Sequence, residues 1–354
     1  TLRTTRVAIP VLNGGRTMAR TQAELAEIVG YSRVTVSKAL SGHPSVQPAT
    51  RERILRTARQ VGYRPNAAAR QMRSGRFHTA ALLTSAKVSH GYMPCTLYCG
   101  LQKGLAERDL MLTVTDVADV DPDAHDAHPR MIREMSADGL FIDFCSAADD
   151  DVRRLVERMP LPAVWLNLKQ DHDAAYIDDV DGGRKATEYL LEAGHTKIGF
   201  LGTTGSKRHY SVADRYAGYA EAMTAAGHTP VDLVPAEQDI GDAQRFARSR
   251  RVLGGEDRPT AIVAYERCEV NIISVLAAEL GLQLGRDLSV VAISDDLYGY
   301  YEKPITRMNI PFERLGRWAV NALVDRIDAP DQPFDSVAVP YDSIVEGETV
   351  GPPA

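Results

Sequence analysis

The stretch "YSRVTVSKALSGHPSV" combines two cations with hydroxyl-bearing and small apolar side chains. The guanidinium group of Arg33 can donate two hydrogen bonds to O6 and N7 of guanine, and Val34 or the methyl group of Thr35 can contact the methyl group of thymine. Ser37 and Lys38 extend the same surface along a helix. These residue types at this spacing predict a surface that reads the base edges of double-stranded DNA.

The charge of the chain is divided unevenly. The formal net charge is -6, yet residues 1–78 carry 14 Lys and Arg against the three acids Glu24, Glu27 and Glu52. The rest of the chain carries 27 basic and 44 acidic residues. Lys and Arg that neutralise phosphates provide salt-sensitive affinity without sequence preference. A basic head on an acidic body therefore predicts a polyanionic partner for the head alone.

Three short helices are predicted to build this head. "TQAELAEIV" opens with a capping box, in which the Thr21 side chain accepts a hydrogen bond from the backbone of Glu24, and Gly30 suits the left-handed position after the helix. Ser32 is a good N-cap for a second helix, "RVTVSKAL". Pro48 fits the first turn of a third helix, which continues through "ATRERILRTARQV". Two short helices joined by a Gly-containing turn and braced by a third form a helix-turn-helix module, whose second helix enters the major groove.

The head resembles the DNA-binding domain of the lactose-repressor/galactose-repressor (LacI/GalR) family. The run "AELAEIVGYSRVTVSKALSGHPSVQPATRERILRTARQVGYRPNAAARQM" matches that family in order and spacing over about fifty residues. The resemblance implies a hinge helix, "AAARQMRSG", that is capped by Asn66, orders on binding DNA, and inserts an apolar wedge into the minor groove. Met72 stands where the family has leucine.

Helix position and the resemblance together define a set of predicted DNA contacts. These are Thr21, Gln22, Ser32, Arg33, Val34, Thr35, Ser37, Lys38, Ser41, Thr50, Arg51, Tyr63, Asn66, Ala69, Met72 and Arg73. Within this set we expect Ser32, Thr50 and Arg51 to bind phosphate, which fixes register without reading sequence.

From residue 79 the pattern changes to short apolar runs that alternate with amphipathic stretches. The strand-like runs are "TAALLTS", "LMLTVTDV", "DGLFIDF", "PAVWLNL", "KIGFLGTT", "TAIVAYE" and "LSVVAIS". Alternation of this kind predicts parallel sheets with helices on both faces. Because this number of strand–helix units is larger than a single sheet usually accommodates, we expect two α/β subdomains.

The body also resembles the LacI/GalR family. The segments "DDVDGGRKATEYLLEAGHTKIGFLG", "RYAGYAEAMTAAG", "RPTAIVAYE" and "DLSVVAISDD" are similar to its effector-binding core. The predicted fold class is therefore a small all-α helix-turn-helix head plus an α/β core of two Rossmann-like, periplasmic-binding-protein-like subdomains. The predicted domains are a flexible arm at 1–19, the helix-turn-helix domain at 20–65, a hinge helix and linker at 66–78, and the core at 79–354. Within the core, the first subdomain is expected at about 79–176 and 306–330, and the second at about 177–305 and 331–350.

The resemblance implies a small ligand between the two subdomains, as open α/β sheets bind ligands beyond the carboxyl ends of their strands. Arg215 matches the family's effector-contacting arginine, and a surface ion-pair partner is the alternative. Asn167, which closes the strand "PAVWLNL", matches an aspartate that faces the ligand. Trp165 lies on the same strand and suits stacking on a sugar ring, and a core tryptophan is the alternative.

Two further strand ends depart from the family pattern. Glu266 and Arg267 stand where the family usually has Asn-Asp, and in "AISDD" its ligand-binding aspartate falls on Ser294 or Asp295. The loss of Asn-Asp leaves three alternatives, namely an unusual saccharide, a charged effector or no effector. We expect a small-molecule effector that is a sugar or a sugar derivative.

The sequence carries no signature of an enzyme or of a metal protein. It lacks the P-loop, H-E-x-x-H and G-x-S-x-G patterns, and we interpret "DPDAHDAHP" as a solvated loop. The cysteines form no C-x-x-C pair and are interpreted as reduced thiols. We therefore predict no catalysis, no cofactor and no metal. The absence of a long apolar run and of a secretory signal predicts no membrane partner and a cytoplasmic location, on the nucleoid when DNA is bound.

These observations predict a transcriptional regulator that binds a pseudo-palindromic operator as a homodimer, with a small molecule controlling its affinity. That it represses is implied by the resemblance. One alternative is a cytoplasmic solute-binding protein or a sugar-acting enzyme with the same α/β body, neither of which accounts for the basic head. Another is a nonspecific architectural DNA binder, which leaves the large body unexplained.

Overall fold

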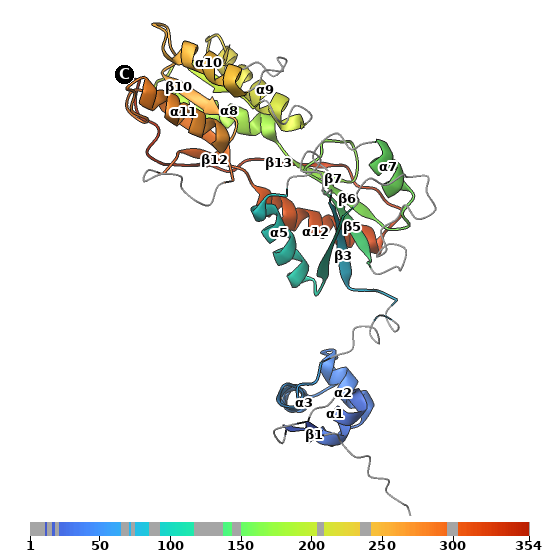
Figure 1. The fold of residues 1–354 in the computed structure, drawn as a ribbon. Coiled ribbons are helices and arrows are strands. Elements are labelled where there is room, and N and C mark those ends of the chain that lie inside the picture. The colour runs from blue at the N-terminus through green and yellow to red at the C-terminus, as the bar shows by residue number, and fades with distance from the viewer. Residues whose placement is uncertain are drawn as a thin grey trace, which may run out of the picture. The chain divides into compact units, whose positions relative to one another are not determined.

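The computed structural model describes residues 11–12, 16–17, 21–64, 71, 75–84, 93–116, 137–143, 150–203, 209–233, 242–295 and 304–353. The chain forms two compact units, Thr1–Phe77 and His78–Ala354 (Figure 1). No helix of the described residues is long and apolar enough to cross a membrane.

The first unit contains the helix-turn-helix. Its elements are β1 (Val11–Leu12), β2 (Arg16–Thr17), α1 (Gln22–Val29), α2 (Arg33–Leu40) and α3 (Pro48–Gln60). The three helices confirm the helical predictions, and the Thr21 side chain accepts from the Glu24 backbone N–H at 3.2 Å. Gly30 follows α1 with φ of 74°, the left-handed conformation that glycine adopts without steric cost. Leu25, Val36 and Ile54 are fully buried where the three helices meet.

The predicted flexible arm contains a short hairpin. β1 and β2 pair antiparallel, with Val11 opposite Thr17 and Leu12 opposite Arg16. The sequence between them begins with Asn13-Gly14, the dipeptide most typical of tight hairpins. The prediction overlooked this signal because the apolar run beside it is short.

The second unit contains two six-stranded sheets. The first has strand order β13-β7-β6-β5-β3-β4 and consists of β3 (Thr79–Thr84), β4 (Met111–Asp116), β5 (Gly139–Ile142), β6 (Ala163–Leu166), β7 (Ala174–Ile177) and β13 (Val337–Val339). The second has order β14-β12-β11-β10-β8-β9 and consists of β8 (Ile198–Leu201), β9 (Val231–Asp232), β10 (Ala261–Ala264), β11 (Ser289–Ser294), β12 (Arg307–Asn309) and β14 (Ile344–Val345). All pairs are parallel except β12 with β14.

Helices cover both faces of each sheet, which confirms the predicted pair of α/β subdomains. Around the first sheet lie α5 (Cys95–Glu107), α7 (Asp150–Glu157) and α12 (Phe312–Asp328), and around the second lie α8 (Asp179–Glu192), α9 (Tyr210–Ala225), α10 (Asp242–Leu253) and α11 (Arg267–Glu279). α5 and α12 pack together, as do α8 and α9. One hydrophobic cluster runs through both subdomains, so their cores are continuous.

The chain passes between the sheets in a different pattern from the predicted one. β12 pairs with β11 in the second sheet, so 307–309 do not belong to the first subdomain. β13 pairs with β7 in the first sheet, so 337–339 do not belong to the second. Strands of two or three residues carry no measurable side-chain alternation, and only their tertiary pairing reveals them.

Helices α8 and α9 approach each other closely at two glycines. A Cβ atom on Gly183 would lie 2.1 Å from the backbone oxygen of Arg215, and one on Gly218 would lie 2.0 Å from that of Val180. Any larger residue would force the two backbones apart. This close crossing brings the first turn of α8 beside Arg215 of α9.

Candidate functional site

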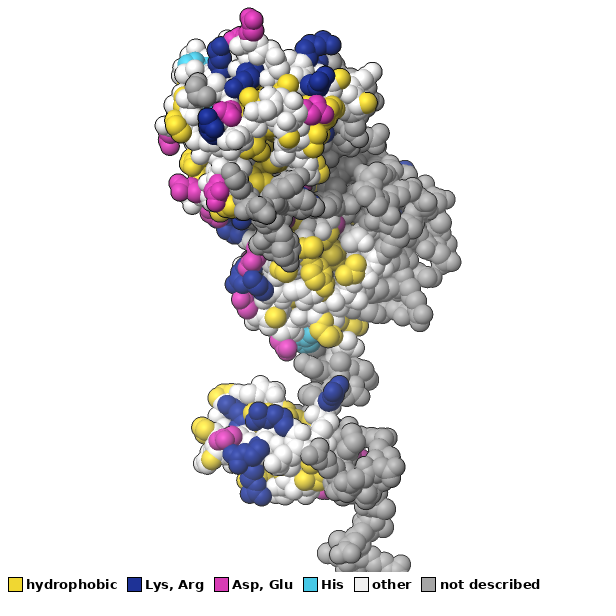
Figure 2. Space-filling model, turned by 60° about the vertical axis from the view of Figure 1, so that its left-hand side comes forward, with side chains coloured by type: hydrophobic (Ala, Val, Ile, Leu, Met, Phe, Trp, Pro, Cys, Tyr) yellow, Lys and Arg dark blue, Asp and Glu magenta, His cyan; other side chains and the backbone are white. Residues whose placement is uncertain are grey.

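Helix α2 presents an exposed face that is both cationic and apolar. Val36 and Ala39 are buried against the other helices, whereas Arg33, Val34 and Lys38 are exposed. Val34 is 64% exposed, so its side chain is available for contact with a thymine methyl group. Figure 2 shows Lys and Arg side chains gathered on this unit.

The start of α2 is fixed by its own N-cap. Ser32 Oγ accepts from the backbone N–H of Thr35 at 3.1 Å, and the hydroxyl groups of the two residues are 2.8 Å apart. The cap satisfies an N–H that has no partner within the helix. It therefore holds the end of the helix that is predicted to enter the groove.

Substitution of Ser32 by alanine is expected to destabilise the head by about 1 kcal/mol, because the cap is lost. Hydrogen exchange of the full-length protein should show about fivefold less protection across 21–64. Ser32→Asn restores a capping oxygen and should retain the protection. Equal protection in Ser32→Ala and the wild type would contradict the role of the cap.

Two predicted DNA contacts have structural roles within the head. Arg51 donates from Nη2 to the backbone oxygens of Gly42 and His43, at 3.0 and 2.6 Å, and so braces the turn after α2. The Tyr63 ring packs in the helical core and is only 9% exposed. For both residues, contact with DNA remains a prediction.

The other predicted DNA contacts divide into two groups. Thr21 and Ser41 are exposed, and Gln22, Thr35, Ser37 and Thr50 are half-buried, all on the head. Asn66, Ala69, Met72 and Arg73 lie outside the described residues, and so does most of the predicted hinge helix.

In the core, the carboxyl edges of the two sheets face each other. Asn167 follows β6 of the first sheet, its backbone oxygen accepts from Nε2 of His209 at 3.1 Å, and its Oδ1 accepts from the Tyr210 hydroxyl at 2.8 Å. Both partners belong to the start of α9, which packs on the second sheet. Thr96 of α5 donates to Oδ2 of Asp295, which follows β11, at 2.7 Å. We call the region between these two bridges the junction.

Asn167 is held in one orientation at the junction. Its φ of 53° lies in the left-handed region, which asparagine tolerates better than most residues. The Tyr210 hydroxyl that binds its Oδ1 also accepts from the N–H of Ile177 at 2.9 Å. Burial raises the pKa of Tyr210 well above its usual value, so this hydroxyl stays protonated and keeps donating. The Nδ2 group of Asn167 is then the one that can donate to a ligand.

Arg215 forms a buried ion pair with Asp179. Its Nε donates to Asp179 Oδ1 at 2.7 Å, and the two side chains are 6% and 1% exposed. Nη1 donates to the backbone oxygen of Tyr265 at 2.7 Å, and the guanidinium group lies 4.5 Å from the centre of the Tyr265 ring. The Tyr341 hydroxyl also donates to Asp179 Oδ1, at 2.7 Å. Arg215 is therefore fixed by the protein itself, with Nη2 left to reach a ligand.

The ion pair keeps Arg215 charged despite its burial. Burial alone opposes the charge, but the neighbouring Asp179 outweighs it, and the pKa of Arg215 is raised well above its ordinary value. Burial lowers the pKa of His209, so its ring stays neutral. The neutral ring can donate from Nε2 to the backbone oxygen of Asn167.

The remaining predicted effector residues are not all at the junction. Ser294 ends β11 and is buried, and Glu266 precedes α11 with extended backbone and is half-buried. Trp165 instead packs with Leu140 and Leu155 in the cluster between the first sheet and α7. Its ring also lies 5.3 Å below the guanidinium carbon of Arg153. This position does not support stacking on a ligand and fits the alternative of a core tryptophan.

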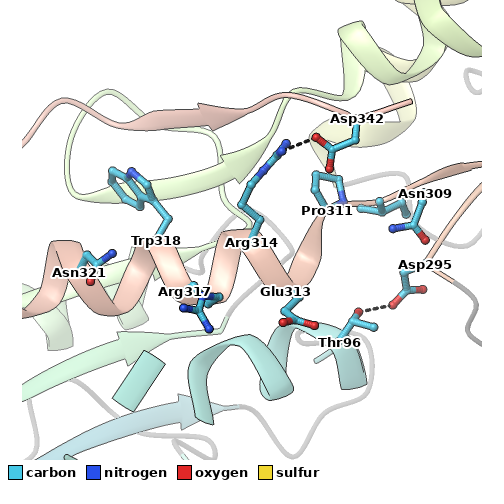
Figure 3. Close-up of a pocket in the computed structure, with 11 residues that line it drawn as sticks. Thr96, Asp295, Asn309, Pro311, Glu313, Arg314, Arg317, Trp318, Asn321 and Asp342 are labelled. Carbon is cyan, nitrogen blue, oxygen red and sulfur yellow. Dashed lines mark hydrogen bonds and ion pairs between the residues drawn. The ribbon is translucent and has the colours of Figure 1, made fainter. Parts of the chain in front are cut away.

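A cavity of about 500 Å³ lies beside α12 (Figure 3). It is lined by Thr96, Asp295, Asn309, Ile310, Pro311, Glu313, Arg314, Arg317, Trp318, Asn321 and Asp342. Both of its arginines are paired within the protein, because Arg314 binds Asp342 and Arg317 binds Glu107. Among the predicted effector residues, only Asp295 borders this cavity.

Sequence reasoning missed three buried residues of the core. Asp179 accepts from both Arg215 and Tyr341, and Asp143 follows β5 at the carboxyl edge of the first sheet. Asp179 lies in the acidic first turn of α8. Acidic residues there are already explained by the favourable interaction of negative charge with a helix N-terminus, so they do not indicate an ion pair. Asp143 was included in a predicted strand, although an acid directly after four buried residues at a strand end is a usable signal.

The described residues hold no group of three or more His, Cys, Asp or Glu that could bind a metal ion. Cys95, Cys99 and Cys268 are free and exposed. The Asp- and His-rich segment at 121–129 and Cys145 lie outside the described residues.

Comparisons with known proteins match both parts of the chain. Residues 21–66 match the model described as "Bacterial regulatory proteins, lacI family", and residues 187–350 match "Periplasmic binding protein-like domain". The HTH-type transcriptional regulator CelR of Thermobifida fusca is 28% identical over 315 residues, which cover 86% of this chain and 90% of that protein. The ribose operon repressor of Escherichia coli is 26% identical over 316 residues, which cover 88% and 94%.

Solved structures share the fold along nearly the whole chain. The lac repressor dimer bound to operator and the anti-inducer ONPF has a TM-score of 0.67 and 22% identity, and the match covers 94% of this chain and 99% of that one. The CelR–cellobiose complex has a TM-score of 0.59 and 24% identity, with coverage of 94% and 100%. In both comparisons a head and a core of the present kind occur in a single chain.

Proposed function

We propose that this chain, which belongs to the lacI family of bacterial regulatory proteins, represses transcription by binding a pseudo-palindromic operator as a homodimer and is controlled by a small-molecule effector. The observation that carries the proposal is the exposed face of α2, where Arg33, Val34 and Lys38 stand on a helix capped at the end that enters the groove. Such a protein acts in the cytoplasm, on the nucleoid.

A homodimer is supported by exposed apolar residues on the core. Met111 and Val114, on the edge strand β4, are 57% and 54% exposed, and Tyr98 on the neighbouring α5 is exposed as well. Val275 on α11 is exposed in the second subdomain. One head reads only a few base pairs, so two heads related by a two-fold axis are needed for a pseudo-palindrome.

We propose that the effector binds at the junction, where Nη2 of Arg215 and Nδ2 of Asn167 are available and Asp295 lies at the end of β11. A saccharide is supported by the names of relatives, one a ribose operon repressor and another solved with cellobiose. The two bridges across the junction, Asn167 with α9 and Thr96 with Asp295, make the spacing of the subdomains sensitive to what lies between them. An effector with different affinity for two spacings shifts the equilibrium between them.

Fluorescence anisotropy against a pool of pseudo-palindromic duplexes, at two salt concentrations, tests DNA recognition. We expect one duplex to bind at least about a thousandfold more tightly than random DNA, with affinity that falls steeply as salt rises. Equal binding of every duplex would overturn sequence-specific repression.

Substitution of Arg33 by alanine is expected to weaken binding to the preferred duplex by about 1–3 kcal/mol per half-site and to relax preference at one base pair, because a bidentate contact to guanine is lost. The matched control is Arg56→Ala, which removes an exposed α3 arginine that pairs with Glu52. It should change affinity much less and leave preference intact. The same loss in both variants would mean that Arg33 acts through charge alone.

A further inference from the structure

Asp143 is a buried acid that directly follows β5, the strand paired with β6, which ends just before Asn167 of the junction. Strand β5 is central in the first sheet, and the Asp143 side chain is only 2% exposed. Its backbone N–H donates to the Leu83 oxygen at 2.9 Å, so the sheet fixes its position. Its Oδ1 has no hydrogen-bond partner, and no described cation forms an ion pair with it. A native protein rarely leaves such a group unsatisfied without a functional reason.

No ion pair among the described residues balances the charge of Asp143. Burial raises the pKa of its carboxyl group to about 6, so most molecules carry the negative charge at neutral pH. Arg215, the buried arginine of the junction, is already matched by Asp179. Among the described residues, the carboxylate of Asp143 therefore has no counter-ion, and a cationic ligand would supply one.

We propose that the effector is an amine-bearing sugar, whose ammonium group binds the Asp143 carboxylate while its hydroxyl groups meet Asn167 and Arg215. This inference rests on the proposed function, since it names the effector class of the same site. An ammonium group donates charge-assisted hydrogen bonds to Oδ1 and at the same time neutralises the buried negative charge. A neutral sugar hydroxyl can donate to Oδ1 but leaves the charge in place.

The position of Asp143 explains how such an effector would reach both subdomains. Its backbone is fixed by the first sheet, and Arg215 is held by α8 and α9 of the second subdomain. A ligand that binds both spans the junction. Such a ligand binds one spacing of the subdomains more tightly than another. This difference in affinity is what control of the head requires.

The test uses the full-length protein and pairs of sugars that differ by one amine. The amines are glucosamine, galactosamine, mannosamine and the β-1,4-linked glucosamine disaccharide, and the neutral counterparts are glucose, galactose, mannose and cellobiose. Thermal unfolding and calorimetry report binding, and anisotropy on the preferred duplex reports control. We expect at least one amine to bind at least tenfold more tightly than its counterpart and to change operator affinity.

Variants assign the effect to the carboxylate. Asp143→Asn should weaken binding of that amine at least tenfold. Asp138→Asn, which alters an acid at the amino end of the same strand, should bind the amine as the wild type does. Failure of all four amines to bind, tighter binding of the neutral sugars, or unchanged amine binding in Asp143→Asn would each overturn the proposal. If operator binding is intact, these failures concern the effector alone, whereas loss of operator specificity concerns the proposed function.

Discussion

Replacement of Asp179 by alanine is expected to lower the free energy of unfolding of the core by about 3–5 kcal/mol, because it leaves the charge of Arg215 buried without its partner. The carboxylate accepts from both Arg215 and Tyr341 at 2.7 Å, so the substitution also leaves a buried hydroxyl without an acceptor. Urea unfolding of the full-length protein, followed by circular dichroism, measures the loss.

The adjacent pair of Lys169 and Asp214 provides a matched control. Its nitrogen and oxygen are 2.7 Å apart, as in the buried pair, but Lys169 is about half exposed. Asp214→Ala should therefore cost less than about 1 kcal/mol, as surface ion pairs do. The double variant Asp179→Leu with Arg215→Met removes both charges and should recover much of the stability lost in Asp179→Ala. If Asp179→Ala costs no more than Asp214→Ala, the buried pair does not stabilise the core.

The main elements of the fold were predictable because each carries its own local signal. The seven apolar runs of the body are all strands, and the three helices of the head begin where Thr21, Ser32 and Pro48 place them. By contrast, β7 and the short strands after residue 305 were not predicted. The run "AAYI" of β7 is brief and begins with small residues. The strands β12, β13 and β14 are defined only by their pairing with neighbouring strands.

The candidate site was predictable only where a residue type suggested its chemistry. Asn167, Ser294 and Asp295 lie at strand ends as expected, and Arg215 belongs to α9, whose first residues contact Asn167. The ion pair with Asp179 was not predictable, because it depends on the close crossing of α8 and α9 at Gly183 and Gly218. Sequence spacing does not reveal a backbone approach between two helices.

Substitution of Asp143 by asparagine is expected to stabilise the ligand-free protein at pH 8 by about 3 kcal/mol, since a rise in pKa from 3.8 to about 6 corresponds to that energy. The sign follows from the direction of the shift. The folded state binds the proton more tightly than the unfolded chain does, so the stability of the wild type falls as pH rises from about 4 to 6 and is then constant. The neutral amide avoids this cost.

The pH dependence separates this effect from ordinary repacking. The gain of Asp143→Asn over the wild type should be full at pH 8, roughly half as large at pH 5, and absent below about pH 4. Asp138→Asn is the control, because Asp138 Oδ2 accepts from the Thr79 N–H at 3.2 Å and so has a partner. It should show no gain at pH 8. A gain in Asp143→Asn that does not change with pH would come from packing rather than from charge, and a loss at pH 8 would mean that the carboxylate is compensated. A gain that follows the expected pH curve would mean that Asp143 carries an uncompensated charge, which is the condition for recruiting a cation.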